Sequence, residues 1–197
     1  DRQQDDPLSF LYGSDHRVVS LSVIAFVLYA LGYSERALAT SQEALIFARK
    51  QSRLHDLAFA QVMAALLHQH RQDAVLSQQC AEAAIKLSTE QGFQTWEAQG
   101  RILRGGAVAE QGQAEEGVAQ MRQALTASQP TGPRPLHVEY LGLLARVYAK
   151  AGNREEGLRT VAEAVTIVAE AGTHWYEAEL YRLRGELTLQ EASLEQV

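Results

Sequence analysis

Apolar residues recur along this chain at intervals of three and four positions. In the segment HVEYLGLLARVYAKAG they form a stripe of Leu141, Leu144, Ala145 and Tyr148. This spacing places side chains on one face of an α-helix, whereas a strand would alternate at every second position. The same spacing continues through most of the sequence. It predicts helices near residues 15–31, 34–51, 54–70, 73–91, 94–111, 114–128, 135–151, 154–171 and 174–190.

The helical pattern itself repeats every forty residues. The segment AEQGQAEEG at Ala109–Gly117 returns as AKAGNREEG at Ala149–Gly157. A fixed period between 20 and 50 residues is typical of stacked repeat proteins. Four series of small residues share the period: Ala44, Ala84, Ala124 and Ala164; Ala25, Ala65, Gly105, Ala145 and Gly185; Ala37, Ser77, Gly117 and Gly157; and Gly92, Gly132 and Gly172.

The repeated phrase predicts a turn between two antiparallel helices. Gly152 suits the positive φ at which many helices end. Asn153 can cap the next helix, and the acidic pair Glu155 and Glu156 lies at its positive end. Small residues on both helices allow their axes to cross closely. The segment HQHRQD at His68–Asp73 lacks the turn glycine, which leaves the geometry of the second hairpin open.

These patterns predict an all-α fold, a right-handed superhelical solenoid of antiparallel helix hairpins. Each hairpin leaves an apolar face that only a stacked neighbour can bury. We expect one domain over residues 1–197, with residues 1–14 as the remnant of a preceding unit. It contains four hairpins and a terminal helix, at about 15–51, 54–91, 94–128, 135–171 and 174–190.

Composition narrows the environment and the partners. The net charge is −6 and no run of Lys or Arg occurs, so no direct contact with nucleic acid is expected. The lone cysteine, Cys80, cannot form an internal disulfide, which favours a reducing, cytoplasmic location. The most apolar segment, Val18–Tyr33, is shorter than the roughly 20 residues of a spanning helix, so no membrane contact is expected.

The sequence contains no arrangement typical of an enzyme or a metal site. His68 and His70 are two positions apart and point to different faces of a helix. The acidic pairs at 115–116 and 155–156 are adjacent, which suits helix capping better than acid–base catalysis. No phosphate-binding GxxxxGK segment occurs. We therefore predict no catalytic residue, no metal and no cofactor.

The small residues resemble those of the tetratricopeptide repeat, in particular Ala25, Ala37 and Ala44 in unit one and Ala145, Gly157 and Ala164 in unit four. The forty-residue unit is similar to the longer repeats in the sensor domain of the maltose-regulon activator. The motifs FLYGSDHRVVSLS, YALGYSERAL, AALLHQHRQD, STEQGF and YEAELYRLRGELTL resemble the carboxy-terminal repeats of large bacterial signalling proteins. Those proteins carry a class III nucleotide cyclase or another effector domain, then a STAND-type ATPase. The resemblance implies a sensory or scaffold segment of a multidomain regulator.

Function is therefore sought on the concave face, which the first helix of each hairpin lines in such arrays. We predict that this face binds peptide segments or effector domains of the same protein. The predicted binding residues are Phe26, Tyr29, Phe59, Gln69, His70, Glu110, Arg146, Lys150, Arg182 and Glu186.

Two alternatives stay open for this face. Its amino-terminal half is apolar and aromatic, and the interpretation we place first is that this half contacts a preceding repeat or is partly buried in the curve of the array. The other alternative is that the face closes on a small ligand, an inducer that controls an upstream ATPase or cyclase. An open groove would favour protein contacts, and an enclosed cavity with convergent polar groups would favour a metabolite. The sequence leaves the oligomeric state open.

Overall fold

The computed structural model describes residues 15–127, 134–172 and 174–194. Within these ranges the chain forms helices and turns, and no strand occurs, which confirms the all-α fold class. Four antiparallel hairpins precede a last helix, as predicted. The helices are α2 (His16–Ala30), α3 (Ser34–Lys50), α4 (Leu54–His70), α5 (Ala74–Gln91), α6 (Gln94–Glu110), α7 (Ala114–Ala127), α8 (Arg134–Lys150), α9 (Arg154–Ala171) and α10 (Glu177–Leu194).

The helix bounds follow the prediction closely. Helices α4 and α9 begin and end at the predicted residues, and α10 begins three residues later and ends four residues later than predicted. Residues 1–14, predicted as the remnant of a preceding unit, lie outside the described residues, as does Gly132.

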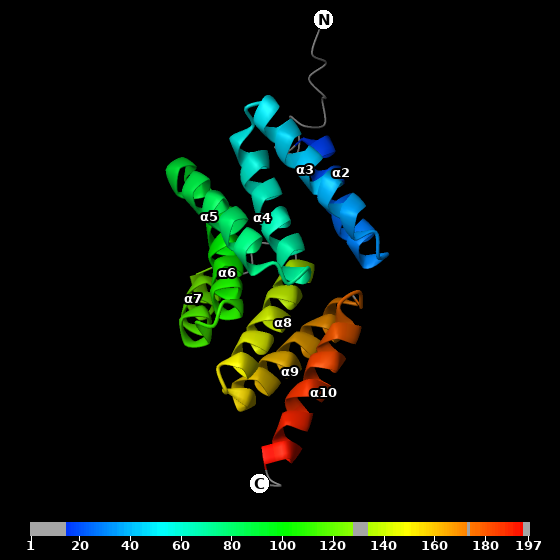
Figure 1. The fold of residues 1–197 in the computed structure, drawn as a ribbon, viewed down its shortest axis with the longest axis vertical. Helices are drawn as coiled ribbons and strands as arrows, with labels where there is room; N and C mark the ends of the chain where they lie inside the picture. Colours follow the sequence, from blue (N-terminus) through cyan, green and yellow to red (C-terminus); the bar gives the residue numbers. More distant parts are fainter. Residues whose placement is uncertain (1–14, 128–133, 173, 195–197) are drawn as a thin grey trace, which may run out of the picture. The chain divides into compact units, whose positions relative to one another are not determined.

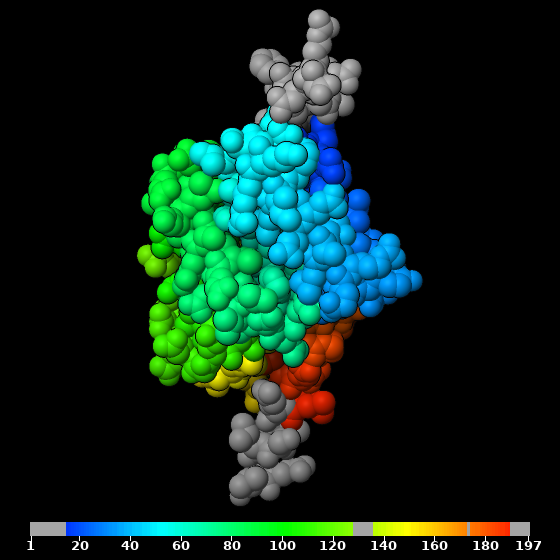
Figure 2. Space-filling view, turned by 45° about the horizontal axis from the view of Figure 1, so that its top comes forward, coloured from blue at the N-terminus to red at the C-terminus, as the bar shows by residue number. Residues whose placement is uncertain are grey.

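The chain divides into two compact units, Asp1–Gly100 and Arg101–Val197. In the first unit, α2 packs against α3 and α4 packs against α5 (Figure 1). On the face shown in Figure 2, the atoms of this unit, coloured blue to green, form a continuous surface. In the second unit, α8 packs against α9, and α10 packs against both. The predicted single domain over residues 1–197 stays a prediction.

Small residues lie where the two helices of a hairpin cross. Ala44, Ala84, Ala124 and Ala164 are each at most 3% exposed. In the second hairpin the Ser77 hydroxyl donates a hydrogen bond of 3.0 Å to the carbonyl oxygen of Ala65. These observations confirm that the repeated small residues let the helices approach closely.

The second hairpin forms without its glycine because Gln72 adopts the glycine conformation. Gln72 has φ of 60°, where Gly112 and Gly152 have 96° and 74°. The Gln72 amide donates to the carbonyl of Gln69 at 3.2 Å, and the amide of the next residue, Asp73, donates to the carbonyl of His68 at 3.0 Å. The turn at Gly112 has the same pair of bonds, so the geometry left open by the sequence is that of the other hairpins.

The expected side-chain cap at Asn153 is wrong. Asn153 occupies the N-cap position of α9, but its side chain makes no capping hydrogen bond. Its backbone carbonyl accepts from the amide of Gly157 at 3.1 Å, and this starts the helix without the side chain. In the second hairpin Asp73 does cap, since its carboxylate accepts from the amide of Leu76 at 3.1 Å.

Candidate binding surfaces

Three predicted binding residues of the first unit come together where α2 and α4 end. The rings of Phe26 and His70 meet edge to face, with centroids 5.1 Å apart, and the Tyr29 ring lies 6.0 Å from His70. The Tyr29 hydroxyl donates a hydrogen bond of 2.8 Å to the backbone carbonyl of His70. All three side chains stay partly exposed. This aromatic group therefore combines a fixed geometry with accessible ring surface.

Phe59 belongs to a second aromatic cluster in the same unit. Its ring lies 5.3 Å from that of Trp96, and the Trp96 indole donates a hydrogen bond of 3.0 Å to Nε2 of His55. His55 also meets Phe93 edge to face at 5.2 Å. Because the indole nitrogen can only donate, Nε2 of His55 acts as the acceptor. The cluster joins the first turn of α4 to the start of α6.

Gln69, predicted to lie on the binding face, is 3% exposed. Its amide oxygen lies 3.2 Å from the Ser77 hydroxyl of α5 and shares that single proton with the carbonyl oxygen of Ala65. The side chain therefore satisfies a polar group inside the α4–α5 hairpin, and the structure does not place it on an open surface. A binding role for Gln69 stays a prediction.

The charged residues predicted in the second unit form two separate groups. Glu110 at the end of α6 pairs with Lys150 at 2.8 Å and with Arg146 at 3.8 Å, both on α8. On α10, Arg182 makes a two-point contact with Glu179, at 2.6 and 2.7 Å, and also pairs with Glu186. A ligand that binds these cations must therefore compete with carboxylates already in place.

A buried tyrosine, Tyr176, lies near residues of both charged groups. Its ring is so close to α8 that a Cβ on Gly142 would stand 2.6 Å from its Cε1. Burial, and then the nearby Glu139 carboxylate, raise the pKa of the Tyr176 hydroxyl well above its usual value. Glu139 is itself 1% exposed. The hydroxyl thus stays protonated, and Tyr176 acts in packing.

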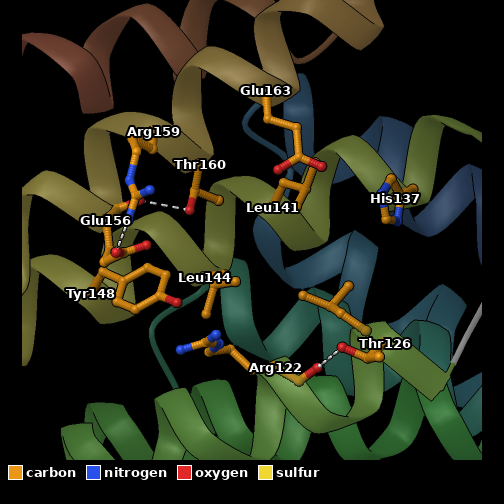
Figure 3. A pocket seen from close by; sticks show the side chains of 11 residues that line it. Arg122, Thr126, His137, Leu141, Leu144, Tyr148, Glu156, Arg159, Thr160 and Glu163 are labelled. Carbon is orange, nitrogen blue, oxygen red and sulfur yellow. Dashed lines mark hydrogen bonds and ion pairs between the residues drawn. The ribbon is translucent and has the colours of Figure 1, made fainter.

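The second unit also contains an open cavity of about 400 Å³ that the sequence did not predict. It lies between α7, α8 and α9, and Figure 3 shows Arg159 paired with Glu156 on the α9 wall, with His137 of α8 some way along the cavity. Its lining residues are Arg122, Leu125, Thr126, His137, Leu141, Leu144, Tyr148, Glu156, Arg159, Thr160 and Glu163. Two guanidinium groups, an imidazole and two carboxylates make it a mixed polar cavity.

The cavity was not predicted, because its lining combines the first helix α8 with the second helices α7 and α9, which no single helix pattern joins. Arg122, Arg159 and Glu163 lie on second helices. Polar residues at helical spacing on these helices indicate a surface exposed to solvent. Trp96 of the aromatic cluster could have been predicted from the sequence. It is the first residue of the segment WEAQGRILRG, which is repeated as YEAELYRLRG eighty residues later.

Helix α2 and the residue that follows it, Leu31, carry an exposed apolar stripe in addition to the aromatic group. Val23, Ile24, Val27 and Leu31 are 48, 47, 51 and 66% exposed. One repeat later, Leu67 stands at the position of Val27 and is 1% exposed, packed against Ala25 and Ala37 of the preceding hairpin. The stripe is thus the face that a preceding hairpin covers elsewhere in the chain.

Other kinds of site find little support among the described residues. No group of three His, Cys, Asp or Glu side chains there could hold a metal ion. No described helix combines the length and the apolar character needed to cross a bilayer. Burial raises the pKa of the Cys80 thiol, with a smaller opposing effect from Arg49, so the thiolate is disfavoured.

Antiparallel hairpins at a forty-residue period, crossing at small residues, define a protein with TPR-like repeats. Two solved structures share this fold: TPR-like repeats of a candidate kinesin light chain from Podosopora anserina, and a form of the same protein with a single substitution. They are 19 and 18% identical to this chain, each with a TM-score of 0.57, over 91% of this chain and 92% of theirs. No family model matches the sequence, and no curated protein matches it. The likeness is one of fold.

Proposed function

We propose that this chain is a protein-interaction module whose first helices bind peptide segments. The observation that carries the proposal is the group of Phe26, Tyr29 and His70, whose rings are held in place yet partly exposed. Preordered aromatic side chains lose little entropy on binding and are frequent centres of binding energy. The preferred ligand is therefore a peptide with an apolar or aromatic anchor residue.

In the second unit, we propose that the charged groups are polar contact sites of that unit by itself. Arg146, Lys150 and Glu110 form one group, and Arg182 and Glu186 form the other. Since each cation already has a carboxylate partner, these groups add selectivity more than affinity. Binding through them weakens as salt is added, because partly exposed charges are screened.

The wider setting of the module is part of the same proposal. The resemblance to the carboxy-terminal repeats of bacterial STAND ATPase and cyclase proteins supports a cytoplasmic regulator in which the repeats contact effector domains of the same protein. The fold supports a scaffold role without catalysis.

The test is selection of peptides from a displayed random library on the full chain, followed by affinity measurements. We expect the selected peptides to share an apolar anchor, and His70→Ala and Phe26→Leu to weaken their binding at least tenfold. Gln42→Ala, at an exposed site on α3, is the matched control and keeps wild-type affinity. Equal affinity in all three variants, with folding intact, would show that the aromatic group is not the binding site.

A second candidate function is small-ligand sensing, which the volume and polar lining of the cavity in the second unit support, whereas its open mouth favours a protein contact. Its volume of about 400 Å³ falls within the range of ligand sites, and Arg122, His137 and Tyr148 offer polar groups. A thermal-shift screen of metabolites tests this function. The expected sign of a true ligand is stabilisation that Arg122→Ala removes and Gln123→Ala, an exposed neighbour on α7, retains. Stabilisation equal in both variants would place the ligand elsewhere.

A further inference from the structure

The floor of the cavity in the second unit runs along most of α8. Four residues of this helix line it, each three or four positions after the one before: His137, Leu141, Leu144 and Tyr148. Residues at this spacing share one face of a helix. From His137 to Tyr148 the helix rises by about 16 Å, at 1.5 Å per residue. Residues of α7 and α9 complete the lining. A floor of this length matches about five residues of extended peptide, at about 3.3 Å each.

The preceding repeat explains the apolar floor of the cavity. On α6, Arg104 donates a hydrogen bond of 2.7 Å to the amide oxygen of Gln120 on α7, so two long side chains bridge that hairpin. Forty residues later these positions hold Leu144 and Thr160. The Thr160 hydroxyl donates instead to the carbonyl oxygen of Glu156 on its own helix, at 2.7 Å. The α8–α9 hairpin therefore lacks this polar bridge, and a leucine takes its place in the cavity.

Arg122 supplies the cavity with a cation that a ligand can reach. Lys150 and Arg182 of the same unit are held by carboxylates, whereas none of the described residues pairs with the Arg122 guanidinium. Arg122 is exposed, and Figure 3 shows its guanidinium on the same side of the cavity as the Tyr148 ring. The planar fork of a guanidinium fits a carboxylate through two parallel hydrogen bonds. This side of the cavity therefore favours a carboxylate.

The two carboxylates of the lining restrict the charge of what can bind. Glu156 is paired with Arg159 on the same helix, and Glu163 lies exposed further along α9. Their negative charge disfavours a ligand with several negative charges, such as a phosphate monoester. Leu141 and Leu144, which are 5 and 6% exposed, offer an apolar surface beside the charged groups. The lining therefore suits a single carboxylate next to an apolar group.

The spacing of these groups defines a short pattern in an extended peptide. Leu144 lies one helical turn from Tyr148, about 6 Å along the axis of α8. Residues two positions apart in an extended chain are about 6.6 Å apart and point to the same face. An acidic residue beside Arg122 and Tyr148 therefore places the residue two positions away over Leu144. The open mouth of the cavity lets such a chain enter and leave, as a protein contact requires.

We propose that this cavity binds an extended segment of a partner polypeptide in which an acidic residue stands two positions from an apolar residue. The carboxylate of the segment accepts hydrogen bonds from Arg122, and the apolar side chain packs on Leu141 and Leu144. The cavity and the aromatic group of the proposed function share no residue, so the failure of one proposal does not decide the other. A small ligand is the competing occupant of the same cavity.

The test begins with peptides selected from a displayed random library on the full chain carrying His70→Ala, which weakens the aromatic group. We expect peptides with an acidic residue two positions from an apolar one, and saturable binding in fluorescence anisotropy. Arg122→Gln should weaken this binding at least tenfold, as should an amide in place of the acidic residue of the peptide. Arg122→Lys, which keeps the charge without the fork, should weaken it less. Gln123→Ala, an exposed neighbour on α7, is the matched control and should keep the affinity.

A graft from the preceding repeat provides a second variant. Leu144→Arg combined with Thr160→Gln copies the bridge of Arg104 and Gln120 into the cavity, and should abolish peptide binding. The proposal is overturned if no selected peptide contains the acidic and apolar pair, or if Arg122→Gln binds the peptides as tightly as the unsubstituted cavity.

Hexanoate, a small carboxylate with an apolar chain, tests the competing occupant. If hexanoate raises the unfolding temperature of the wild-type chain but not of Arg122→Gln, and no selected peptide displaces it, the cavity is a small-ligand site and the peptide proposal fails. If the peptides displace hexanoate, or if hexanoate has no effect while the peptides bind, the peptide proposal is supported.

Discussion

The crossing of α6 and α7 provides the sharpest test of close helix packing as the basis of this fold. In a Gly117→Ala variant the new Cβ would stand 2.6 Å from the carbonyl oxygen of Gly105 and 2.7 Å from Cβ of Ala109. Ordinary contacts between such atoms are about 3.5 Å, so the two helices must separate by roughly 1 Å. Neither obstacle can rotate away, because one belongs to the backbone and the other is directly attached to it.

Two effects of opposite sign determine the size of the change. Alanine is a better helix former than glycine by about 1 kcal/mol, which favours the variant. Overpacking a tight contact costs about 1–3 kcal/mol, and an obstacle fixed to the backbone places this site in the upper half of that range. We therefore expect Gly117→Ala to lower the free energy of unfolding by about 1–2 kcal/mol.

Urea unfolding followed by far-ultraviolet circular dichroism measures this difference. The matched control is Gly185→Ala, where the new Cβ meets nothing within 4 Å and only the gain in helix propensity remains. The control should raise the free energy of unfolding by up to about 1 kcal/mol. If Gly117→Ala is as stable as wild type, the hairpins do not depend on glycine-sized crossings and the packing argument fails.

Three further predictions concern other positions. Gln72→Gly should stabilise the chain by about 0.5–1 kcal/mol in the same urea assay, because φ of 60° strains a residue that has a Cβ. The control Gln79→Gly, inside α5, should destabilise the chain. A change of the same sign in both variants would refute strain at Gln72. Ala164→Leu should destabilise by a few kcal/mol through overpacking, and wild-type melting would contradict it. Burial lowers the pKa of His68 below its usual 6.5, so the His68 imidazole binds a proton more readily in the unfolded chain than in the folded chain. Stability should therefore decline as the pH falls below 6.5, and less steeply in His68→Gln; parallel pH profiles would refute the assignment.

The helices could be predicted because their signals are local. Apolar spacing and turn residues lie within a few positions of the structure they specify, and the bounds of α4 and α9 were predicted to the residue. The lack of a glycine at position 72 does not prevent the turn, because two backbone hydrogen bonds and the Asp73 cap hold Gln72 in the glycine conformation. Local strain is tolerated when the surrounding structure fixes the residue.

The candidate surfaces were less predictable because they depend on neighbours distant in sequence. Repeat register placed Phe26, Tyr29 and His70 on adjoining faces, and they do meet. Register gives the direction of Gln69 on its helix but not the depth at which Ser77 and α5 cover it. The cavity depends on the spacing of α7, α8 and α9, which no single helix pattern encodes.

The boundary between the two compact units falls inside α6, and this has a practical consequence for dividing the chain. Trp96 and Gly100 of this helix make their contacts in the first unit, while Gly105 and Ala109 make theirs in the second. A cut between residues 100 and 101 would leave each half with a stump too short to hold its helical shape. Anyone separating the halves for expression should give both of them a complete copy of residues 94–110.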